Sequence, residues 1–277
     1  MKAIHKLLSH VPEWAKQPFR NVAGKPHPFG LAYSERRQLR GLPRYHATTT
    51  SLFGKSIQVA DAASFLASHQ EIFEKHIYRI PTEKSAPVII DAGANIGLAS
   101  IYAYLAHPEA KITAIESDPD ICRILQNNFN SFGMNQATVL LGAAWDRAEQ
   151  IRFSPDHADA GRISAEGTMA VSGIRLKDLI VQAGDVDFLK MDIEGAELKV
   201  LQDCEPELSR VHRLFVEYHS TTSQPQQLSQ LLAILERASM RYYVEHTGVH
   251  STSPLVDRQT EAGFDLQLNI FAIRKNQ

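Results

Sequence analysis

The sequence predicts an α/β fold in which a mostly parallel sheet is covered by helices on both faces. From Val88 onward, short runs rich in Val, Ile and Leu alternate with segments of helical periodicity. This alternation is typical of βαβ units and predicts a three-layer sandwich. Two apolar runs end in the carboxylates Asp91 and Glu116, and the carboxyl ends of parallel strands face the ligand crevice in such folds. We expect seven strands, at residues 88–91, 112–116, 138–142, 188–192, 214–217, 241–245 and 266–273.

The segment that follows the first strand reads Asp-Ala-Gly-Ala-Asn-Ile-Gly over residues 91–97. A turn of small residues brings backbone N–H groups and a helix N-terminus close to a ligand, and glycines leave room there. Dinucleotide-binding enzymes need three glycines as G-x-G-x-x-G, whereas Asn95 takes the middle position here. No pyrophosphate is therefore favoured. Asp91 favours a cationic or amine-bearing ligand, and S-adenosylmethionine offers an ammonium and a sulfonium.

The end of the second strand supplies another carboxylate, Glu116, 25 residues after Asp91. A carboxylate in this place accepts hydrogen bonds from ribose hydroxyls; the alternative is a solvated loop residue. Trp145 either forms a wall for adenine or packs on a neighbouring helix. The cofactor-binding residues that we expect are Asp91, Gly93, Ala94, Asn95 and Gly97 for the methionine part, Glu116 and Ser117 for the ribose, Ala143 and Ala144 for the adenine, and Asp192 at the end of the fourth strand.

The fourth predicted strand ends in a concentration of ionisable residues within 186–197. Lys190 and Asp192 come last in a central strand, so we expect them to contact substrate or cofactor. Glu194 and Glu197 have two interpretations. They either join this site, or they place negative charge at a helix N-terminus, where it contributes about 0.3–1 kcal/mol.

These segments resemble the FkbM-type S-adenosylmethionine-dependent methyltransferases. The hallmarks are the residues 88–97 and, more specifically, Lys-Met-Asp-Ile-Glu-Gly-Ala-Glu at 190–197, and the resemblance covers residues 57–273. It implies a class I methyltransferase (Rossmann-like) fold, with seven strands and an antiparallel last strand. It also implies S-adenosylmethionine as cofactor and methyl transfer to a hydroxyl of a sugar, glycan or glycosylated natural product. Residues 81–277 would form this methyltransferase domain.

Methyl transfer to a neutral hydroxyl benefits from a general base and from exact positioning of the two reactants. His219 follows the fifth strand and can accept a proton near neutral pH. It and Asp192 are the candidate bases, although His219 could instead only hydrogen-bond a carboxylate. Lys190 either steadies a developing oxyanion or pairs with Glu217. The residues that we assign to catalysis are His219, Asp192, Glu194 and Lys190.

A metal-assisted version of this reaction is open but not favoured. Asp192, Glu194 and Glu217 are hard oxygen ligands that could hold Mg²⁺ and lower the pKa of the acceptor hydroxyl. Carboxylates can equally bind sugar hydroxyls directly, so we assign no metal ligands. Cys122 and Cys204 lie far apart in the sequence, which indicates neither a zinc site nor a disulfide framework.

The first 80 residues are expected to form a basic extension that contains a helix and helps to form the substrate site. Residues 1–50 hold nine Lys and Arg against two acids, although the whole chain has a net charge of −2. Residues 62–76 have helical periodicity, with Asp61 or Ser64 as the cap. Four arginines form a face for an anionic acceptor, or they belong to a leader that folds back onto the acidic body: Arg36, Arg37, Arg40 and Arg44.

An insertion at 150–172 is expected to form a hairpin near the crevice, with a mobile loop at 156–167 that would act as a lid. Few aromatic residues accompany the basic ones, so nucleic acid is not an expected partner. Neither a signal peptide nor a stretch of about 18 apolar residues is found, which favours a cytoplasmic location without a transmembrane segment.

Two other functions compete with the methyltransferase hypothesis. An NAD(P)-dependent oxidoreductase is disfavoured by the missing third glycine. A catalytically silent S-adenosylmethionine-binding module would require degeneration at Asp192, Glu194 or His219, and these residues keep side chains capable of chemistry.

Overall fold

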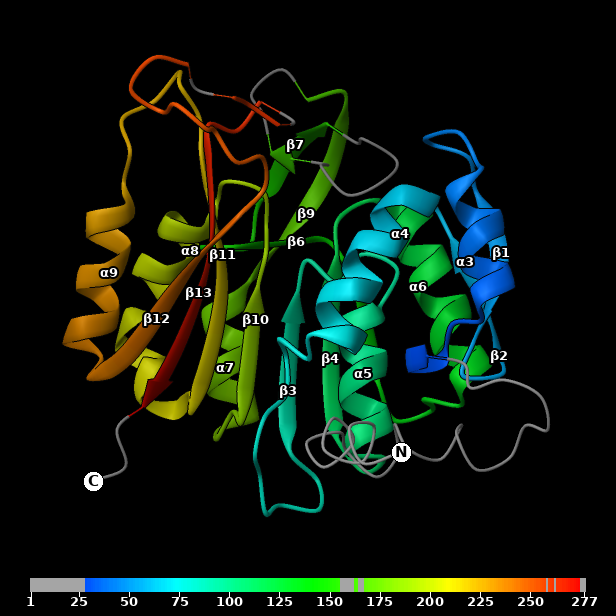
Figure 1. Ribbon diagram of the computed structural model, residues 1–277. Helices are drawn as coiled ribbons and strands as arrows, with labels where there is room; N and C mark the ends of the chain where they lie inside the picture. The colour runs from blue at the N-terminus through cyan, green and yellow to red at the C-terminus, as the bar shows by residue number, and fades with distance from the viewer. Residues whose placement is uncertain (1–27, 155–161, 164–166, 258, 262, 275–277) are drawn as a thin grey trace, which may run out of the picture.

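A seven-stranded sheet forms the centre of the molecule in the computed structural model, which describes residues 28–154, 162–163, 167–257, 259–261 and 263–274 (Figure 1). The strand order is β12-β13-β11-β10-β3-β4-β5. All neighbours are parallel except at β13, which is antiparallel to both β11 and β12. The strands are β3 (Val88–Ala92), β4 (Lys111–Glu116), β5 (Thr138–Leu141), β10 (Phe188–Met191), β11 (Arg213–Ser220), β12 (Met240–Thr247) and β13 (Leu266–Arg274). The predicted mostly parallel sheet with an antiparallel last strand is confirmed.

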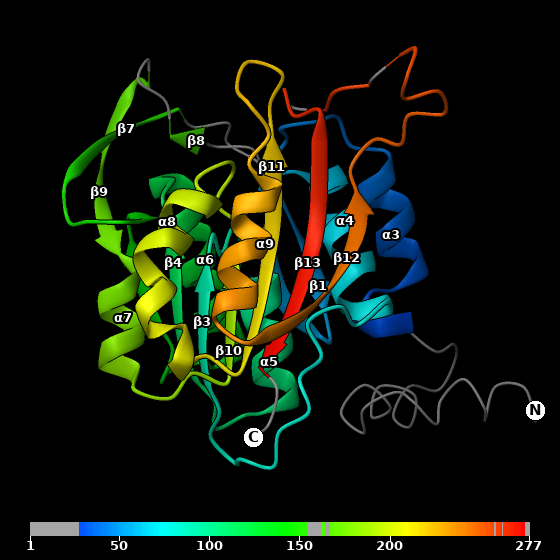
Figure 2. The same ribbon diagram turned by 90° about the vertical axis from the view of Figure 1, so that its left-hand side faces the viewer.

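Helices cover both faces of this sheet, as the two perpendicular views show (Figures 1 and 2). Residues that alternate along β10 face opposite layers, so Leu189 and Met191 pack on one side and Phe188 on the other. This alternation, together with apolar residues throughout the strands, is what a sheet buried on both faces requires. One layer contains α7 (Leu176–Ala183), α8 (Glu197–Cys204) and α9 (Leu228–Arg237), and the other contains α5 (Leu98–Ala106) and α6 (Pro119–Phe132).

The chain before the sheet packs against the α5 and α6 layer. Asn128 of α6 ties the two together, because its side chain accepts from the N–H of Gln58 at 2.7 Å and donates to the carbonyl of Gln58 at 3.0 Å. The predicted helix is present with Asp61 as its cap, whose carboxylate accepts from the N–H of Ser64 at 2.9 Å. The elements are η2 (Pro28–Gly30), α3 (Tyr33–Arg40), β1 (Thr48–Leu52), β2 (Lys55–Val59), α4 (Ala62–His69) and the π-helical turn η3 (Gln70–Glu74).

The predicted hairpin within residues 150–172 is also present. Its two strands pair antiparallel, from Gln150 opposite Ser172 to Phe153 opposite Met169. Of the predicted lid at 156–167, all but residues 162–163 and 167 lie outside the described residues. The elements of this region are β6 (Ala143–Trp145), β7 (Gln150–Ser154), β8 (Arg162–Ile163) and β9 (Met169–Arg175), followed by η4 (Glu205–Arg210) after α8.

Candidate active site

The backbone N–H groups of the turn between β3 and α5 are all hydrogen-bonded to other groups of the chain. Its five N–H groups, at residues 93–97, all donate hydrogen bonds within the chain. The acceptors are the carbonyl of Ile115 for Gly93 and Ala94 (3.0 and 2.9 Å), Oε2 of Glu116 for Asn95 (2.8 Å), Oδ1 of Asn95 for Ile96 (2.6 Å) and the carbonyl of Ala94 for Gly97 (2.9 Å). The turn is therefore a preformed corner, and its N–H groups are already engaged rather than directed at a phosphate.

The glycines of this turn are required by the packing of the chain itself. Gly93 has φ +78°, and a Cβ there would lie 1.7 Å from the carbonyl oxygen of Asp192. Gly97 has φ +92°, and a Cβ there would lie 2.6 Å from Cδ1 of Leu125. The space that we expected the glycines to leave for a ligand is thus filled by the neighbouring strand end and by α6.

Glu116 lies at the tip of β4, where the ribose contact is expected. The residue is 8% exposed, and its Oε2 and Oε1 accept from the N–H groups of Asn95 and Asp118, each at 2.8 Å. Ser117 donates to Oε1 at 3.4 Å. Burial raises the pKa of Glu116, and these N–H groups oppose that rise. A carboxylate has about four lone-pair positions, so acceptor capacity is left for a ligand.

Asp91 and Lys190 form a buried pair beneath the turn. Asp91 is 1% exposed and accepts from the hydroxyl of Ser100 at 2.7 Å. Nζ of Lys190 donates to the carbonyl of Gly93 at 2.7 Å and lies 3.3 and 3.5 Å from the carboxylates of Asp192 and Asp91. Burial raises the pKa of Asp91, which Lys190 opposes. Lys190 thus pairs with these two aspartates, and not with Glu217 as one of our alternatives had it.

Three carboxylates meet at the carboxyl ends of β10 and β11, with His219 behind them. Nε2 of His219 is 3.6 Å from Oε2 of Glu194 and 3.8 Å from Oε1 of Glu217. Glu194 adopts φ +57°, which is uncommon for a residue with a side chain. Burial and then the charge of Asp192 raise the pKa of Glu217 to about 8. Burial also raises the pKa of Glu194, although the charge of His219 opposes this.

His219 is held from behind by Glu197. The imidazole side chain is 1% exposed, and its Nδ1 lies 3.0 Å from Oε1 of Glu197. Burial disfavours the charged imidazole, but the carboxylates of Glu197 and Glu194 outweigh it and raise the pKa to about 10. Glu197 is itself 1% exposed and accepts from the N–H of Gly195 at 2.9 Å. The structure thus agrees with the alternative that we left open for His219, in which its imidazole hydrogen-bonds a carboxylate. Glu197 is buried, so its charge does not lie at an exposed helix N-terminus.

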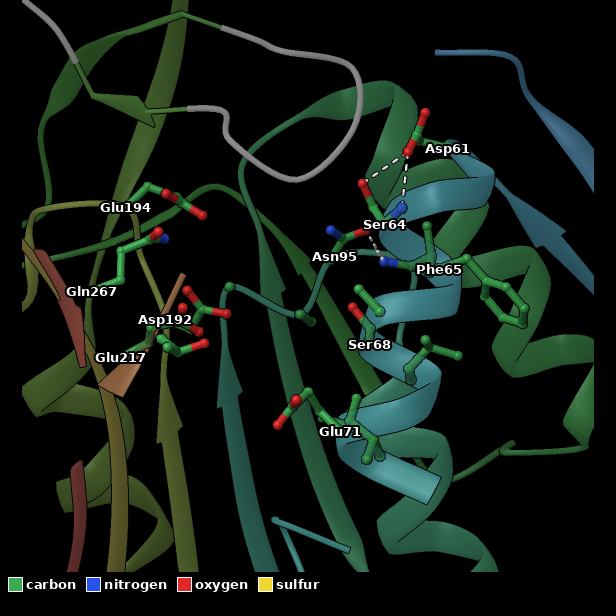
Figure 3. Close-up of a pocket in the computed structure, with 18 of the residues that line it drawn as sticks. Asp61, Ser64, Phe65, Ser68, Glu71, Asn95, Asp192, Glu194, Glu217 and Gln267 are labelled. Atoms are coloured by element: carbon green, nitrogen blue, oxygen red, sulfur yellow. Dashed lines mark hydrogen bonds between the residues drawn. The ribbon is translucent and has the colours of Figure 1, made fainter. Parts of the chain in front are cut away.

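A cavity of about 590 Å³ lies between these strand ends and the N-terminal extension. Asp192, Glu194 and Glu217 occupy one wall, and Ser64, Ser68 and Glu71 of the α4 and η3 segment face them from the other (Figure 3). The described lining that matters here is Asp61, Ser64, Ser68, Glu71, Gly93, Ala94, Asn95, Lys190, Asp192, Glu194, Glu217, Glu261, Gln267 and Asn269. The cavity therefore adjoins the predicted cofactor turn, and its lining combines these polar side chains with apolar ones such as Phe65, Ile72 and Phe264.

Two of the four arginines in the extension bind acids within it. Arg36 pairs with Glu74 and lies 3.1 Å from Nδ1 of His69. Arg44 lines the cavity and pairs with Asp61 at 3.0 Å. Arg37 and Arg40 are exposed on α3. The four residues therefore do not form one basic face, which was one of the two alternatives left open for them.

The expected adenine wall is part of the core. Ala143 and Ala144 are 6% and 3% exposed. Trp145 donates to Glu149 at 2.9 Å, and Nζ of Lys199 on α8 lies 3.7 Å from the ring centroid. Of the two roles that we considered for Trp145, the structure favours packing against a neighbouring helix.

Sequence reasoning missed the wall that α4 supplies and the amide side chains of β13. Asn269 is 5% exposed and stands opposite Glu217 in the register of β11 and β13. A signal existed, because Gln267 and Asn269 interrupt an apolar strand at alternate positions and therefore share one face.

The fold, together with the family model that matches the chain, defines an S-adenosylmethionine-dependent methyltransferase of class I. The family model described as "Methyltransferase FkbM domain" matches residues 91–242, which is more than half of the chain. The chain belongs to this FkbM methyltransferase family, and the resemblance proposed from its motifs is confirmed. None of the described helices combines the length and the apolar character needed to span a membrane.

Curated relatives share part of the sequence. "Methyltransferase sdnD" of Sordaria araneosa is 28% identical over 177 residues, covering 50% of this chain and 68% of that protein. "Hexuronic acid methyltransferase AglP" of Haloferax volcanii is 28% identical over 168 residues (58% and 68%). "2-O-methyltransferase NoeI" of Sinorhizobium fredii is 25% identical over 159 residues (49% and 65%). Among solved structures, "Methyltransferase FkbM" from Methylobacillus flagellatus has a TM-score of 0.46 and 18% identity, covering 76% of this chain and 53% of that one.

Proposed function

We propose that this methyltransferase methylates a hydroxyl oxygen of a sugar, a glycan or a glycosylated natural product. The observation that supports the proposal is the polar cavity beside the cofactor turn, whose walls offer carboxylate, amide and hydroxyl groups to a polyhydroxyl molecule. The names of AglP and NoeI, a hexuronic acid methyltransferase and a 2-O-methyltransferase, agree with this acceptor class.

The cofactor would be held by residues that the chain already orients. The turn at 93–97 and the buried carboxylate of Glu116, with Ser117 beside it, form a rigid corner at the ends of β3 and β4. Glu116 keeps lone pairs for ribose hydroxyls. When bound, S-adenosylmethionine supplies an electrophilic methyl group on a sulfonium. Asp91 would act through Lys190, because it is buried beneath the corner.

The acceptor would be positioned by the two walls of the cavity. Its oxygen must approach the methyl carbon in line, and holding that geometry supplies much of the rate. The acceptor oxygen gains the methyl group, the carbon–sulfur bond breaks towards sulfur, and the hydroxyl proton passes to a carboxylate. Asp192 and Glu217 line the cavity and can receive this proton. His219 lies behind Glu194 and Glu217 and would position them instead.

The engaged N–H groups of residues 93–97 favour this proposal over a nicotinamide-dependent enzyme, because a pyrophosphate would need free donors there. Calorimetric titration of the full chain with S-adenosylmethionine, S-adenosylhomocysteine and NADH tests the choice. We expect saturable binding of the first two only. Incubation with labelled S-adenosylmethionine and a panel of sugars, followed by mass spectrometry, then tests transfer. Cofactor binding without methylation of any tested acceptor would favour the silent module.

A further inference from the structure

The acidic cluster on the strand side of the cavity has the spacing of a metal site. One ligand atom each of Asp192, Glu194 and His219 lie within 4.8 Å of one another. Two atoms that each lie about 2.1 Å from one ion are about 3 to 4 Å apart. The 3.6 Å between Nε2 of His219 and Oε2 of Glu194 falls within that range. Small side-chain adjustments would therefore complete the coordination.

The orientation of His219 matches that of a metal ligand. Its Nδ1 is 3.0 Å from Oε1 of Glu197, and Glu197 is fixed in turn by the N–H of Gly195. A histidine that binds a metal usually donates its other ring N–H to a carboxylate, which leaves the remaining nitrogen for the ion. Nε2 points towards Glu194 and Glu217, as such a ligand would.

A separate observation on β13 also indicates a ligand at this wall. Asn269 is 5% exposed, lines the same cavity and stands opposite Glu217 in the sheet register. Its buried Oδ1 accepts no hydrogen bond from any part of the chain that the structure describes. An unsatisfied buried acceptor costs about 1–3 kcal/mol, and an amide oxygen is a ligand for hard cations, directly or through water.

The balance of charge supports the same conclusion. Four carboxylates converge around His219, and Lys190 is engaged by the carbonyl of Gly93 and by two aspartates. Buried like charges are costly unless a counter-charge compensates them, and a dication that replaces the proton on Nε2 of His219 supplies more positive charge than that proton does. The four carboxylates are those of Asp192, Glu194, Glu197 and Glu217.

We propose that Asp192, Glu194 and His219 bind one divalent cation, with the amide oxygen of Asn269 beside it. Two carboxylates and one imidazole suit a cation that accepts oxygen and nitrogen ligands, such as Mn²⁺, better than Mg²⁺. Its role rests on the proposed function: the ion binds the acceptor hydroxyl and lowers its pKa, so that the proton leaves more easily. This proposal departs from the sequence-based preference for a site without metal ligands.

The experiment uses the full chain, stripped with EDTA and titrated with MnCl₂, while electron paramagnetic resonance follows the signal of free Mn²⁺. We expect one bound ion per chain. Glu194→Gln removes a ligand and should weaken binding more than Glu197→Gln, for which the loss of a supporting hydrogen bond predicts about 10- to 100-fold. Glu71→Gln removes the same charge from the opposite wall and should leave the affinity unchanged. His219→Gln should remove the nitrogen hyperfine coupling from the pulsed spectrum.

Circular dichroism confirms that each variant folds before it is titrated. The proposal is overturned if the folded wild type binds no Mn²⁺ saturably, or if Glu71→Gln weakens binding as much as Glu194→Gln. Calorimetry with S-adenosylmethionine on the same stripped protein separates the two proposals. If the chain binds S-adenosylmethionine but does not bind Mn²⁺, only the ion site is overturned. If it binds Mn²⁺ but does not bind S-adenosylmethionine, only the proposed function is overturned.

Discussion

Two regions differ in how their polar groups are satisfied: the turn at residues 93–97 with Glu116, here called the cofactor corner after its proposed role, and the cavity wall of Asp192, Glu194, Glu217 and Asn269, here called the acceptor wall. At residues 93–97, every backbone N–H donates within the chain, and Glu116 accepts N–H groups from both sides. At the acceptor wall, burial raises the pKa values of Glu194 and Glu217, and Oδ1 of Asn269 lacks a donor among the described residues. The corner is thus preorganised by its own hydrogen bonds, whereas the wall holds crowded charge that a ligand would satisfy.

The largest effect is expected from Gly93→Ala, which attacks the corner. The new Cβ would lie 1.7 Å from the carbonyl of Asp192, in a backbone with φ +78°. We expect a loss of unfolding free energy of about 4 kcal/mol or more, together with loss of cofactor binding. Gly54→Ala is the control, because φ is similar at +74° and its Cβ meets no described atom within 4 Å. It should cost only about 1–2 kcal/mol. Equal losses, measured by chemical denaturation, would contradict the packing argument.

Glu217→Gln tests the wall without disturbing the corner. If Glu217 receives the proton or helps to hold the acceptor, kcat should fall by about 10²-fold or more. Affinity for S-adenosylmethionine should change little, because Glu217 is not part of the turn. Glu207→Gln, on η4 beside Arg210 and outside the lining of the cavity, is the matched control and should keep full activity. A cofactor affinity that falls in parallel with kcat in Glu217→Gln would remove the distinction between the two regions.

Glu116→Gln is the converse test. A neutral amide loses the charge-assisted acceptor for ribose, a contribution of about 1.5 kcal/mol, or roughly 10-fold in affinity for S-adenosylmethionine. At saturating cofactor, kcat should stay near that of the unmodified chain. Calorimetry and steady-state kinetics measure the two quantities. An unchanged affinity would show that Glu116 serves only the N–H groups of Asn95 and Asp118.

The smallest effect concerns pH and the extension that forms the far wall. His69 is fully buried, and burial followed by the charge of Arg36 lowers its pKa from the ordinary 6.5. The folded chain therefore binds this proton more weakly than the unfolded chain does. The stabilisation is present above pH 6.5 and is lost as pH falls, with a slope of at most about 1.4 kcal/mol per pH unit. Urea unfolding at pH 5, 6 and 7 measures it, and His69→Gln should flatten the part of the curve that His69 causes.

The strands of the sheet could be predicted because the preference of a segment for the strand conformation depends on its own residues and their alternation. The run before Asp91 is rich in β-branched residues, the run at 266–273 is mainly apolar with two amides at alternate positions, and both form strands. The turn of the cofactor corner was also predictable from the sequence, since glycine and asparagine readily adopt the left-handed backbone that Gly93, Asn95 and Gly97 have there. The assignments of individual site residues stay predictions.

The acceptor wall was less predictable from the sequence, because its side chains come from segments that lie far apart in the chain. The hydrogen-bonded residues His219 and Glu197 are 22 positions apart, and Asn269 stands opposite Glu217 on the neighbouring strand. Nothing in either local sequence states which partner a side chain will have. The four arginines illustrate the same limit. Their spacing left open one basic face or a leader folded onto the acidic body, whereas Arg36 pairs with Glu74 of η3 and Arg44 with Asp61, the cap of α4.

The sequence by itself determined the fold class and the glycine-containing turn at residues 93–97, because hydrophobic periodicity and backbone sterics act over a few residues. Only the tertiary structure decided that α4 closes the cavity, that His219 is held by Glu197 and that Asn269 joins the carboxylates. Burial, and the electrostatics that follow from it, depend on which distant groups fold around a side chain, and those groups are chosen by packing rather than by neighbours in the chain.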